Sequence, residues 1–447
     1  MAASGFVDLK SAAPAETRVT EGRKIPSQTR FIVVLGLLVA VEPLTIDMYL
    51  PALPQIAEDY SVSSSVVQLT LTGTLAGLAL GQLVIGPLSD SLGRRRPLMA
   101  GIVLHMLASV LCLFAPSIVV LGIARGLQGV GAAAAMVVAL AIVGDLFSNA
   151  GAATVMSRLM LVLGVAPVIA PSLGAAVMLR FSWHWVFAVL VVLAGLLLLL
   201  AALALPETLQ VSHRRPLRVG GILRTYGELL RDLRFVILVL VAALGMSGLF
   251  AYIAGASFVL QGHYGLDQQV FALVFGAGAV ALIAATQFNV VLLRRFTPQT
   301  ITVWALGASV LAGVVFVGLT AADVGGSYDI FAFVIPVWAI LAAMGFVLPN
   351  APAVALSRHP DASGTAAALL GAGQFGLGAA VAPLVGVLGN DELALAAVMT
   401  ATSVIALVAL LAVGVSATDD DGARPVDLSQ NGLIRSVGFL ASQRMVE

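Results

Sequence analysis

The stretch FIVVLGLLVAVEPLTIDMYLPALP, residues 31–54, decides the fold of this chain. Its first ten residues are apolar, and the whole stretch is long enough to cross roughly 30 Å of hydrocarbon as a helix. The remaining residues, 41–54, nevertheless include two carboxylates, Glu42 and Asp47, and three prolines. Ionisable residues inside a membrane helix normally face a polar partner or a water-filled cavity. The stretch therefore predicts a membrane span that has a function.

The composition extends this interpretation to the whole chain. Of the 447 residues, 60% are hydrophobic and only 10% are charged, whereas about a quarter of the residues of a soluble domain are charged. The chain is therefore predicted to be an all-α polytopic membrane protein. We predict twelve spans, at residues 31–54, 66–89, 97–115, 117–145, 154–179, 183–205, 234–261, 270–293, 299–321, 328–350, 362–387 and 392–414.

The basic residues are distributed unevenly about these spans. Apart from Arg125 and Arg180, they lie in or close to the N-terminal tail, the loops that join even to odd spans, and the C-terminal tail. Cytoplasmic loops carry an excess of Lys and Arg. The sequence therefore predicts a multi-pass protein of the cell membrane, the inner membrane in a bacterium, with both termini in the cytoplasm.

The longest connection, residues 206–233, divides the chain into two sets of six spans, 31–205 and 234–414. Residues 1–30 and 415–447 are predicted to be cytoplasmic tails, the second of them disordered. Two six-helix halves are typical of a transporter whose substrate site lies between them. The second part of the connection predicts a short helix on the membrane surface, because one helical face gathers Ile222, Leu223, Tyr226, Leu229, Leu230 and Leu233.

The sequence offers little for enzymatic or metal chemistry. Cys112 is the only cysteine, and the five histidines are scattered without the spacing of metal ligands. A membrane enzyme or receptor would need a His/Asp/Glu or Ser/His cluster near one interface, and none is visible. We therefore expect no enzyme activity, no metal, no cofactor and no nucleic-acid partner.

The loop after span two reads GPLSDSLGRRRPL, residues 86–98. It resembles the G-x-L-a-D-r-x-G-r-r motif of the major facilitator superfamily, through Gly86, Leu88, Asp90, Gly93, Arg94 and Arg95. The resemblance implies twelve helices in two pseudo-symmetric six-helix bundles. It also implies that this loop, with Asp145 at the inner end of span four, closes a cytoplasmic gate against the start of span eleven. Gly86 is expected to permit a close approach of helices.

Two further spans carry motifs. Span four contains RGLQGVGAAAAM, residues 125–136, and an arginine inside hydrocarbon costs several kcal/mol unless it is paired or hydrated. Arg125, Gln128 and Gly129 resemble the R-x-x-q-G pattern of proton-coupled members of the superfamily. Span five, GVAPVIAPSLGAA at 164–176, resembles the antiporter motif of drug exporters, which it matches at Gly164, Pro167, Pro171 and Gly174.

Other segments narrow the resemblance to one branch. The stretches IDMYLPALP, SWHWVF, LPET, GFVLPNAPAVALS and SGTAAALLGAGQF are similar to the Bcr/CflA drug-resistance branch, and the resemblance covers nearly all of residues 31–414. His184 and Gly144 depart from it, because both positions usually hold arginine. The branch implies proton-coupled efflux of chloramphenicol-like or bicyclomycin-like molecules. A proton-coupled carrier of a nutrient or an endogenous metabolite stays open as the alternative.

Depth in the membrane assigns roles to the charged residues. At 1.5 Å per residue, Asp47 lies about 10 Å, Arg125 about 12 Å and Glu42 about 18 Å below the outer surface. Asp47 and Arg125 could therefore pair, while Glu42 lies nearest the midplane and could carry a proton. We expect Glu42 and Asp47 to be proton carriers whose protonation Arg125 influences. The alternative is an Asp47–Arg125 ion pair that only fixes packing.

The substrate is expected to be a small amphipathic molecule, neutral or cationic. Candidate substrate contacts are Gln128, Tyr252, Phe258, Asn350, Gln374 and Phe375. The five from the second half are as readily explained by packing between helices. The partners are thus the drug-like substrate, protons and the lipid bilayer, and a monomer suffices for this mechanism.

Overall fold

The computed structural model describes residues 28–147, 149–214, 216–322 and 330–413. The predicted C-terminal tail and all but the last three residues of the predicted N-terminal tail lie outside these ranges. The elements are α1 (Gln28–Asp47), η1 (Leu50–Ala52), α2 (Leu53–Asp59), α3 (Ser64–Leu92), α4 (Arg95–Leu113), α5 (Ile118–Leu146), α6 (Asn149–Met178), α7 (His184–Ala204), η2 (Val211–His213), α8 (Val219–Arg231), α9 (Leu233–Phe258), η3 (Val259–His263), α10 (Gln268–Leu292), α11 (Pro298–Ala321), α12 (Ile330–Leu356), η4 (Pro360–Ala362), α13 (Ser363–Val381), α14 (Leu384–Val387) and α15 (Glu392–Ala412).

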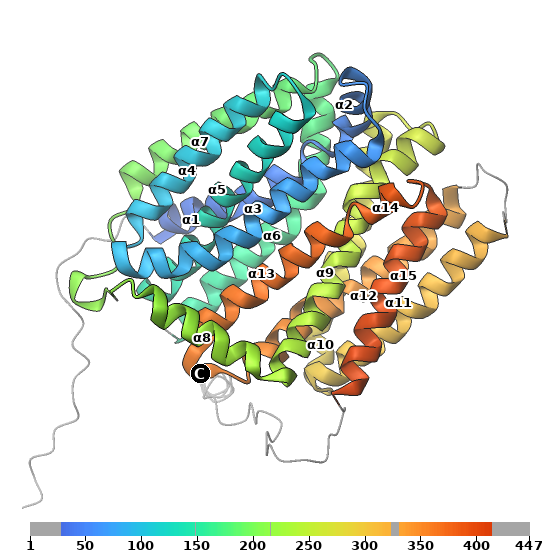
Figure 1. Cartoon of the computed structure of the whole chain (residues 1–447). Coiled ribbons are helices and arrows are strands. Elements are labelled where there is room, and N and C mark those ends of the chain that lie inside the picture. The colour runs from blue at the N-terminus through green and yellow to red at the C-terminus, as the bar shows by residue number, and fades with distance from the viewer. Residues whose placement is uncertain (1–27, 148, 215, 323–329, 414–447) are drawn as a thin grey trace, which may run out of the picture.

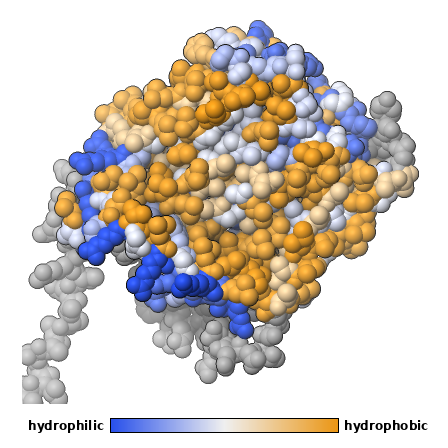
Figure 2. All heavy atoms as spheres, viewed as in Figure 1, coloured by the Kyte–Doolittle hydropathy of each residue, from blue (hydrophilic) through white to orange (hydrophobic). Residues whose placement is uncertain are grey.

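The all-helical prediction is confirmed. The described residues contain twelve helical segments that are long and apolar enough to cross a membrane. Apolar residues cover the sides of these helices, and hydrophilic residues gather at their ends (Figure 2). In the following, the inner end is the one at which α3 ends and α4 begins, which the basic residues predict to be cytoplasmic.

Span ten extends further than predicted, to Leu356, because two prolines near its end do not stop the helix. Proline lacks an N–H, so Pro349 leaves the carbonyl of Gly345 without its helical donor. The hydroxyl of Thr286 in α10 donates to that carbonyl at 2.9 Å. A neighbouring helix thus supplies the missing hydrogen bond, as the hydrocarbon environment requires.

The helices before α8 and those after it meet along two seams. In one seam α3 packs against α13, and in the other α6 packs against α10. Figure 1 shows α3 and α13 side by side, with α8 running across their inner ends. These seams place α1 and α5, with the predicted charged residues, in the interior of the first half.

Glycines allow α3 and α5 to approach closely. A Cβ added at Gly73 would lie 2.6 Å from the carbonyl oxygen of Gly122, and one added at Gly77 would overlap the carbonyl of Gly126. The hydrophobic effect does not operate between helices in lipid, and small residues favour association there because they let the helix backbones pack closely. Gly86 does not take part, since a Cβ there would meet nothing within 4 Å. The expected close approach at Gly86 was therefore wrong, and this glycine lines a cavity instead.

The predicted helix of the connection is present as α8. Leu229 is buried, whereas Leu223 and Leu230, on the predicted apolar face, are exposed. The hydroxyl of Tyr226 donates to the carbonyl of Leu83 at 3.0 Å. That carbonyl lies four residues before Pro87 and so lacks its helical donor. The connection is thus attached to the first half by a hydrogen bond that a proline makes possible.

We predict that Gly77→Ala destabilises the protein, because its methyl group would overlap the backbone of α5. Overpacking a tight contact costs about 1–3 kcal/mol. The measurement is the thermal unfolding midpoint in detergent. Gly122→Ala is the matched control, because a Cβ at Gly122 meets nothing within 4 Å. Equal midpoints for the two variants would contradict the packing described here.

Candidate functional site

The first membrane span is interrupted beside its carboxylates. α1 ends at Asp47, and the chain continues through η1 into α2. Pro51 and Pro54 cannot donate the backbone hydrogen bonds of a continuous helix. The last four carbonyls of a helix also lack partners within it. The carbonyl of Thr45 therefore becomes available to another residue in the membrane interior.

Arg125 of α5 binds this carbonyl. Its side chain is fully buried, and Nη1 donates to the Thr45 carbonyl at 2.8 Å and to Oε1 of Gln128 at 2.9 Å. The guanidinium carbon also lies 4.2 Å from the centre of the Tyr49 ring, a cation–π distance. The cation is thus stabilised by a carbonyl, an amide and an aromatic ring.

The direct ion pair expected between Asp47 and Arg125 is absent from the ion pairs of the described residues. The sequence predicted equal depth for the two residues, but Arg125 donates to the carbonyl of Thr45 at the end of α1 instead of to Asp47. Nε and Nη2 of Arg125 have no hydrogen-bond partner in the described part of the chain. The guanidinium therefore retains two donors that a carboxylate could occupy in another conformation.

Glu42 and Asp47 are both buried, with 8% and 3% of their surface exposed. One oxygen of each, Oε2 of Glu42 and Oδ1 of Asp47, is buried without a hydrogen-bond partner among the described residues. Burying an ionised carboxylate without donors is very costly. In any state that excludes water, each side chain must therefore be neutral or must find a donor.

His105 of α4 was not predicted as a site residue, yet the structure places it here. Its Nε2 lies 2.8 Å from Oγ1 of Thr45, and its Nδ1 is buried without a partner among the described residues. Ser109 donates to the His105 carbonyl and accepts from Nε2 of Gln128, both at 2.7 Å. A histidine within an apolar span is a functional candidate by default. In the sequence, the spacing of His105, Ser109 and Cys112 places them on one face of a helix, and this pattern could have indicated that His105 belongs to the site.

The predicted contacts of the second half pack within that half. Tyr252 stacks on Phe275 with ring centres 5.1 Å apart, and Phe375 lies against Phe250 at 5.8 Å. Asn350 and Asn289 exchange side-chain hydrogen bonds of 2.7 and 3.4 Å. Phe258 is buried, and Gln374 is half-buried on α13. None of these five residues forms a hydrogen bond with Arg125, whereas Gln128 accepts one from it.

Three of the predicted gate residues, Asp90, Arg94 and Asp145, form one charged network at the inner end of the first half. Arg94 donates to both oxygens of Asp145, at 2.9 and 3.3 Å, and also to Asp90. Burial alone would lower the pKa of Arg94, but hydrogen bonds and charges of Asp145 and Asp90 raise it above its ordinary value. Gly93 has a φ of 90°, which favours glycine, and Glu207 accepts the backbone N–H of Arg94 at 2.8 Å.

A cavity separates this network from the start of span eleven. It has a volume of 720 Å³ and is lined by Asp90 and Arg94 on one side and by residues 361–365 on the other. Thr225 and Tyr226, from α8, also line it. The gate contact between the loop and the start of span eleven is not formed in this conformation, because the cavity lies between them. That contact stays a prediction for another conformation.

At the outer end the two halves are joined by hydrogen bonds. Gln68 of α3 is fully buried and donates to Oδ1 of Asn390 at 2.7 Å and to the carbonyl of Ala254 at 3.2 Å. Ser257 of α9 donates to the carbonyl of Leu50 at 2.6 Å. The cavity inside and the closed contacts outside define a conformation that faces inward.

The antiporter motif lies in α6 between α1 and the second half. A Cβ added at Gly174 would overlap the carbonyl of Met48, just after the end of α1. Gly164 lies opposite Ile283 of α10. Pro167 and Pro171 lie inside the helix, which continues through both. The motif thus lets α6 approach the interrupted part of span one.

Charges are buried inside the first of two helical halves, and these halves are joined by hydrogen bonds at the outer end and separated by a cavity at the inner end. This arrangement is that of membrane transporters that work by alternating access. The chain belongs to the Major Facilitator Superfamily, whose family model matches residues 35–383. The predicted membership is confirmed. The solved D-xylose-proton symporter shares the fold, with a TM-score of 0.63 at 17% identity over 85% of this chain and 96% of that one.

Three curated relatives illustrate the similarity. The uncharacterized MFS-type transporter YdgK of Bacillus subtilis is 38% identical over 83% of this chain and 92% of its own length. The bicyclomycin resistance protein homolog of Haemophilus influenzae is 32% identical over 81% and 90%. The chloramphenicol resistance protein of Pseudomonas aeruginosa is 31% identical over 73% and 76%. These names agree with the drug-resistance branch that the sequence resembles.

We predict that Asp145→Asn destabilises the inner network more than Asp90→Asn. Asp145 makes two hydrogen bonds to Arg94 and its side chain is 16% exposed, whereas that of Asp90 is 42% exposed and screened by water. Loss of hydrogen bonds to a charged group costs roughly 1.5–3 kcal/mol, and an exposed pair contributes less than about 1 kcal/mol. Thermal unfolding midpoints of both variants measure the difference. A larger loss for Asp90→Asn would contradict this assignment.

We also predict that Ser257→Ala opens the outer end. The loss of about 1 kcal/mol per hydrogen bond shifts the equilibrium toward the outward-open state roughly fivefold. The measurement is the distance distribution between spin labels at Glu58→Cys and Gly262→Cys, which lie on opposite halves. Ser357→Ala is the control, because the Ser357 hydroxyl bonds only within its own turn. An unchanged distribution for Ser257→Ala would contradict the role of this contact.

Proposed function

We propose that this protein exports amphipathic small molecules across the bacterial inner membrane in exchange for protons. One observation carries the proposal: two carboxylates and an arginine are buried in the first half, and each keeps a polar atom without a partner among the described residues. Such groups are expensive unless protonation or substrate binding satisfies them in the transport cycle. Names of the relatives support drugs as the substrate class.

We infer the following sequence of steps from this geometry. In the inward-facing state the substrate enters through the inner cavity and competes with protons for Glu42 and Asp47. After the outer contacts open, the substrate leaves and protons from outside neutralise the carboxylates. Arg125 alternates between the Thr45 carbonyl and a deprotonated carboxylate, using the two donors that are free in this conformation.

We further propose the organisation that this mechanism requires. Residues 31–205 and 234–414 are the two rocking halves, and residues 206–233 join them on the cytoplasmic side. Both termini, 1–30 and 415–447, are cytoplasmic. One chain contains the complete site, so it acts as a monomer, as a transporter and not as an enzyme.

Proton coupling is tested in proteoliposomes that contain the purified protein. Addition of bicyclomycin or chloramphenicol to wild-type protein is expected to move protons in the opposite direction to the drug. The double variant Glu42→Gln, Asp47→Asn is expected to reduce this proton flux to the level of empty liposomes, because neither neutral side chain can release a proton.

Glu58→Gln is the matched control, since Glu58 is exposed at the outer end of the same span. It should leave the proton flux unchanged. Full coupling in the double variant would contradict the assigned carriers. Drug movement that is insensitive to a proton gradient and to an uncoupler would contradict proton coupling altogether.

A further inference from the structure

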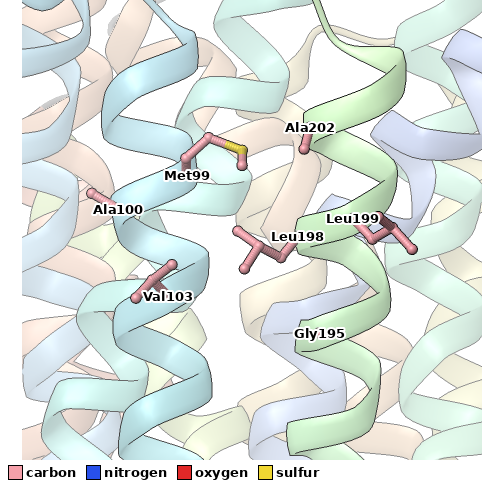
Figure 3. A pocket seen from close by; sticks show the side chains of 7 residues that line it. All are labelled: Met99, Ala100, Val103, Gly195, Leu198, Leu199 and Ala202. Carbon is pink, nitrogen blue, oxygen red and sulfur yellow. The ribbon is translucent and has the colours of Figure 1, made fainter.

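The lipid-facing side of the first half carries a groove that the transport mechanism does not use. It lies between α4 and α7 and has a volume of 590 Å³ (Figure 3). Its lining is apolar and includes Met99, Ala100 and Val103 of α4, and Gly195, Leu198 and Ala202 of α7. The groove is hollow because Gly195 and the two alanines contribute little or no side chain, while longer side chains form its walls.

The groove is at the inner end of the membrane. α4 begins at Arg95, one turn before the first lining residue, and α7 ends at Ala204, just after the last one. From Gly195 to Ala202 the groove follows α7 for about 10 Å at 1.5 Å per residue. One leaflet of a bilayer has roughly 15 Å of hydrocarbon. The groove can therefore hold the headgroup-proximal part of an acyl chain.

Two arginines lie at the mouth of the groove. Nη2 of Arg95 donates to the carbonyl of Ala202 at 2.8 Å, a carbonyl that lacks its helical donor because Pro206 follows four residues later. Arg96 precedes Met99, Ala100 and Val103 by three, four and seven residues, so it lies on the same face of α4.

These arginines have capacity for an anion. Arg96 is exposed and forms no hydrogen bond or ion pair among the described residues. Arg95 uses one side-chain nitrogen for Ala202, and its side chain makes no other hydrogen bond with the described residues. The nearest carboxylate of the network, Glu207, is engaged by the backbone N–H groups of Arg94 and Arg95 and lies 3.7 Å from Arg214.

We propose that the groove binds one anionic phospholipid of the inner leaflet. One acyl chain lies between α4 and α7, and Arg95 and Arg96 bind the phosphate, which matches the planar donor fork of a guanidinium. The lipid would thus contact the same loop that carries the inner charged network. This site is independent of the transported substrate, and it needs only the predicted orientation of the protein in the membrane.

Binding is tested by native mass spectrometry of the purified full-length protein in detergent, titrated with phosphatidylglycerol. Phosphatidylcholine with the same acyl chains is the comparison. We expect one phosphatidylglycerol to be retained more tightly than phosphatidylcholine. Arg96→Gln should weaken phosphatidylglycerol binding about fivefold, the effect of one basic residue near an anionic lipid. Gly195→Leu should weaken both lipids by filling the groove.

Matched controls keep the result interpretable. Arg294→Gln removes an exposed arginine at the inner end of the second half, and Gly307→Leu enlarges a glycine of α11 that has open space around it. Neither should change the binding. A Cβ at Gly195 meets only Met106, at 3.9 Å, so this variant should fold. Equal retention of the two lipids, or equal effects of Arg96→Gln and Arg294→Gln, would overturn the proposal.

Discussion

The rest of the structure depends on one constraint, that backbone carbonyls inside the hydrocarbon must be hydrogen-bonded within the protein. Prolines and helix ends release such carbonyls, and side chains from elsewhere in the chain bind several of them. Arg125 binds the carbonyl of Thr45, Ser257 binds that of Leu50, and Tyr226 binds one in α3. These three bonds position the buried charges, close the outer end and attach the connection between the halves. The same irregularities that interrupt the helices therefore organise the transporter.

This arrangement explains why a permanent cation is tolerated in the membrane interior. Arg125 is held by a carbonyl rather than by a carboxylate, so Glu42 and Asp47 are not committed to a permanent ion pair. A permanent buried ion pair would be costly to separate. A neutral carbonyl binds the guanidinium less strongly than a carboxylate would, so Arg125 can leave it more easily. In the proposed mechanism, the carboxylates are therefore free to exchange a proton or a substrate as the two halves move.

The sequence predicted the spans well because hydrophobic length and the absence of charge depend on the bilayer and not on tertiary contacts. Arg125 was singled out because a charge inside hydrocarbon has few explanations, whereas Asp145 was singled out through the family resemblance. The sequence left an Asp47–Arg125 pair open, and the structure shows the Thr45 carbonyl as the partner of Arg125 instead. Depth along a helix does not tell which acceptor an interrupted helix exposes. His105 was missed because its partner, Thr45, is 60 residues away in the sequence. The close helix approach expected at Gly86 was wrong, since a motif does not state which neighbour a glycine faces.

In the proposed mechanism, the buried carboxylates change protonation when the substrate binds. Infrared difference spectroscopy on the purified protein measures this directly, through the C=O band of protonated carboxyl groups on addition of chloramphenicol or bicyclomycin. We expect loss of a carboxyl band in the wild-type protein and no such loss in the double variant Glu42→Gln, Asp47→Asn. A wild-type spectrum without a carboxyl change on binding, or the same change in the double variant, would contradict this mechanism.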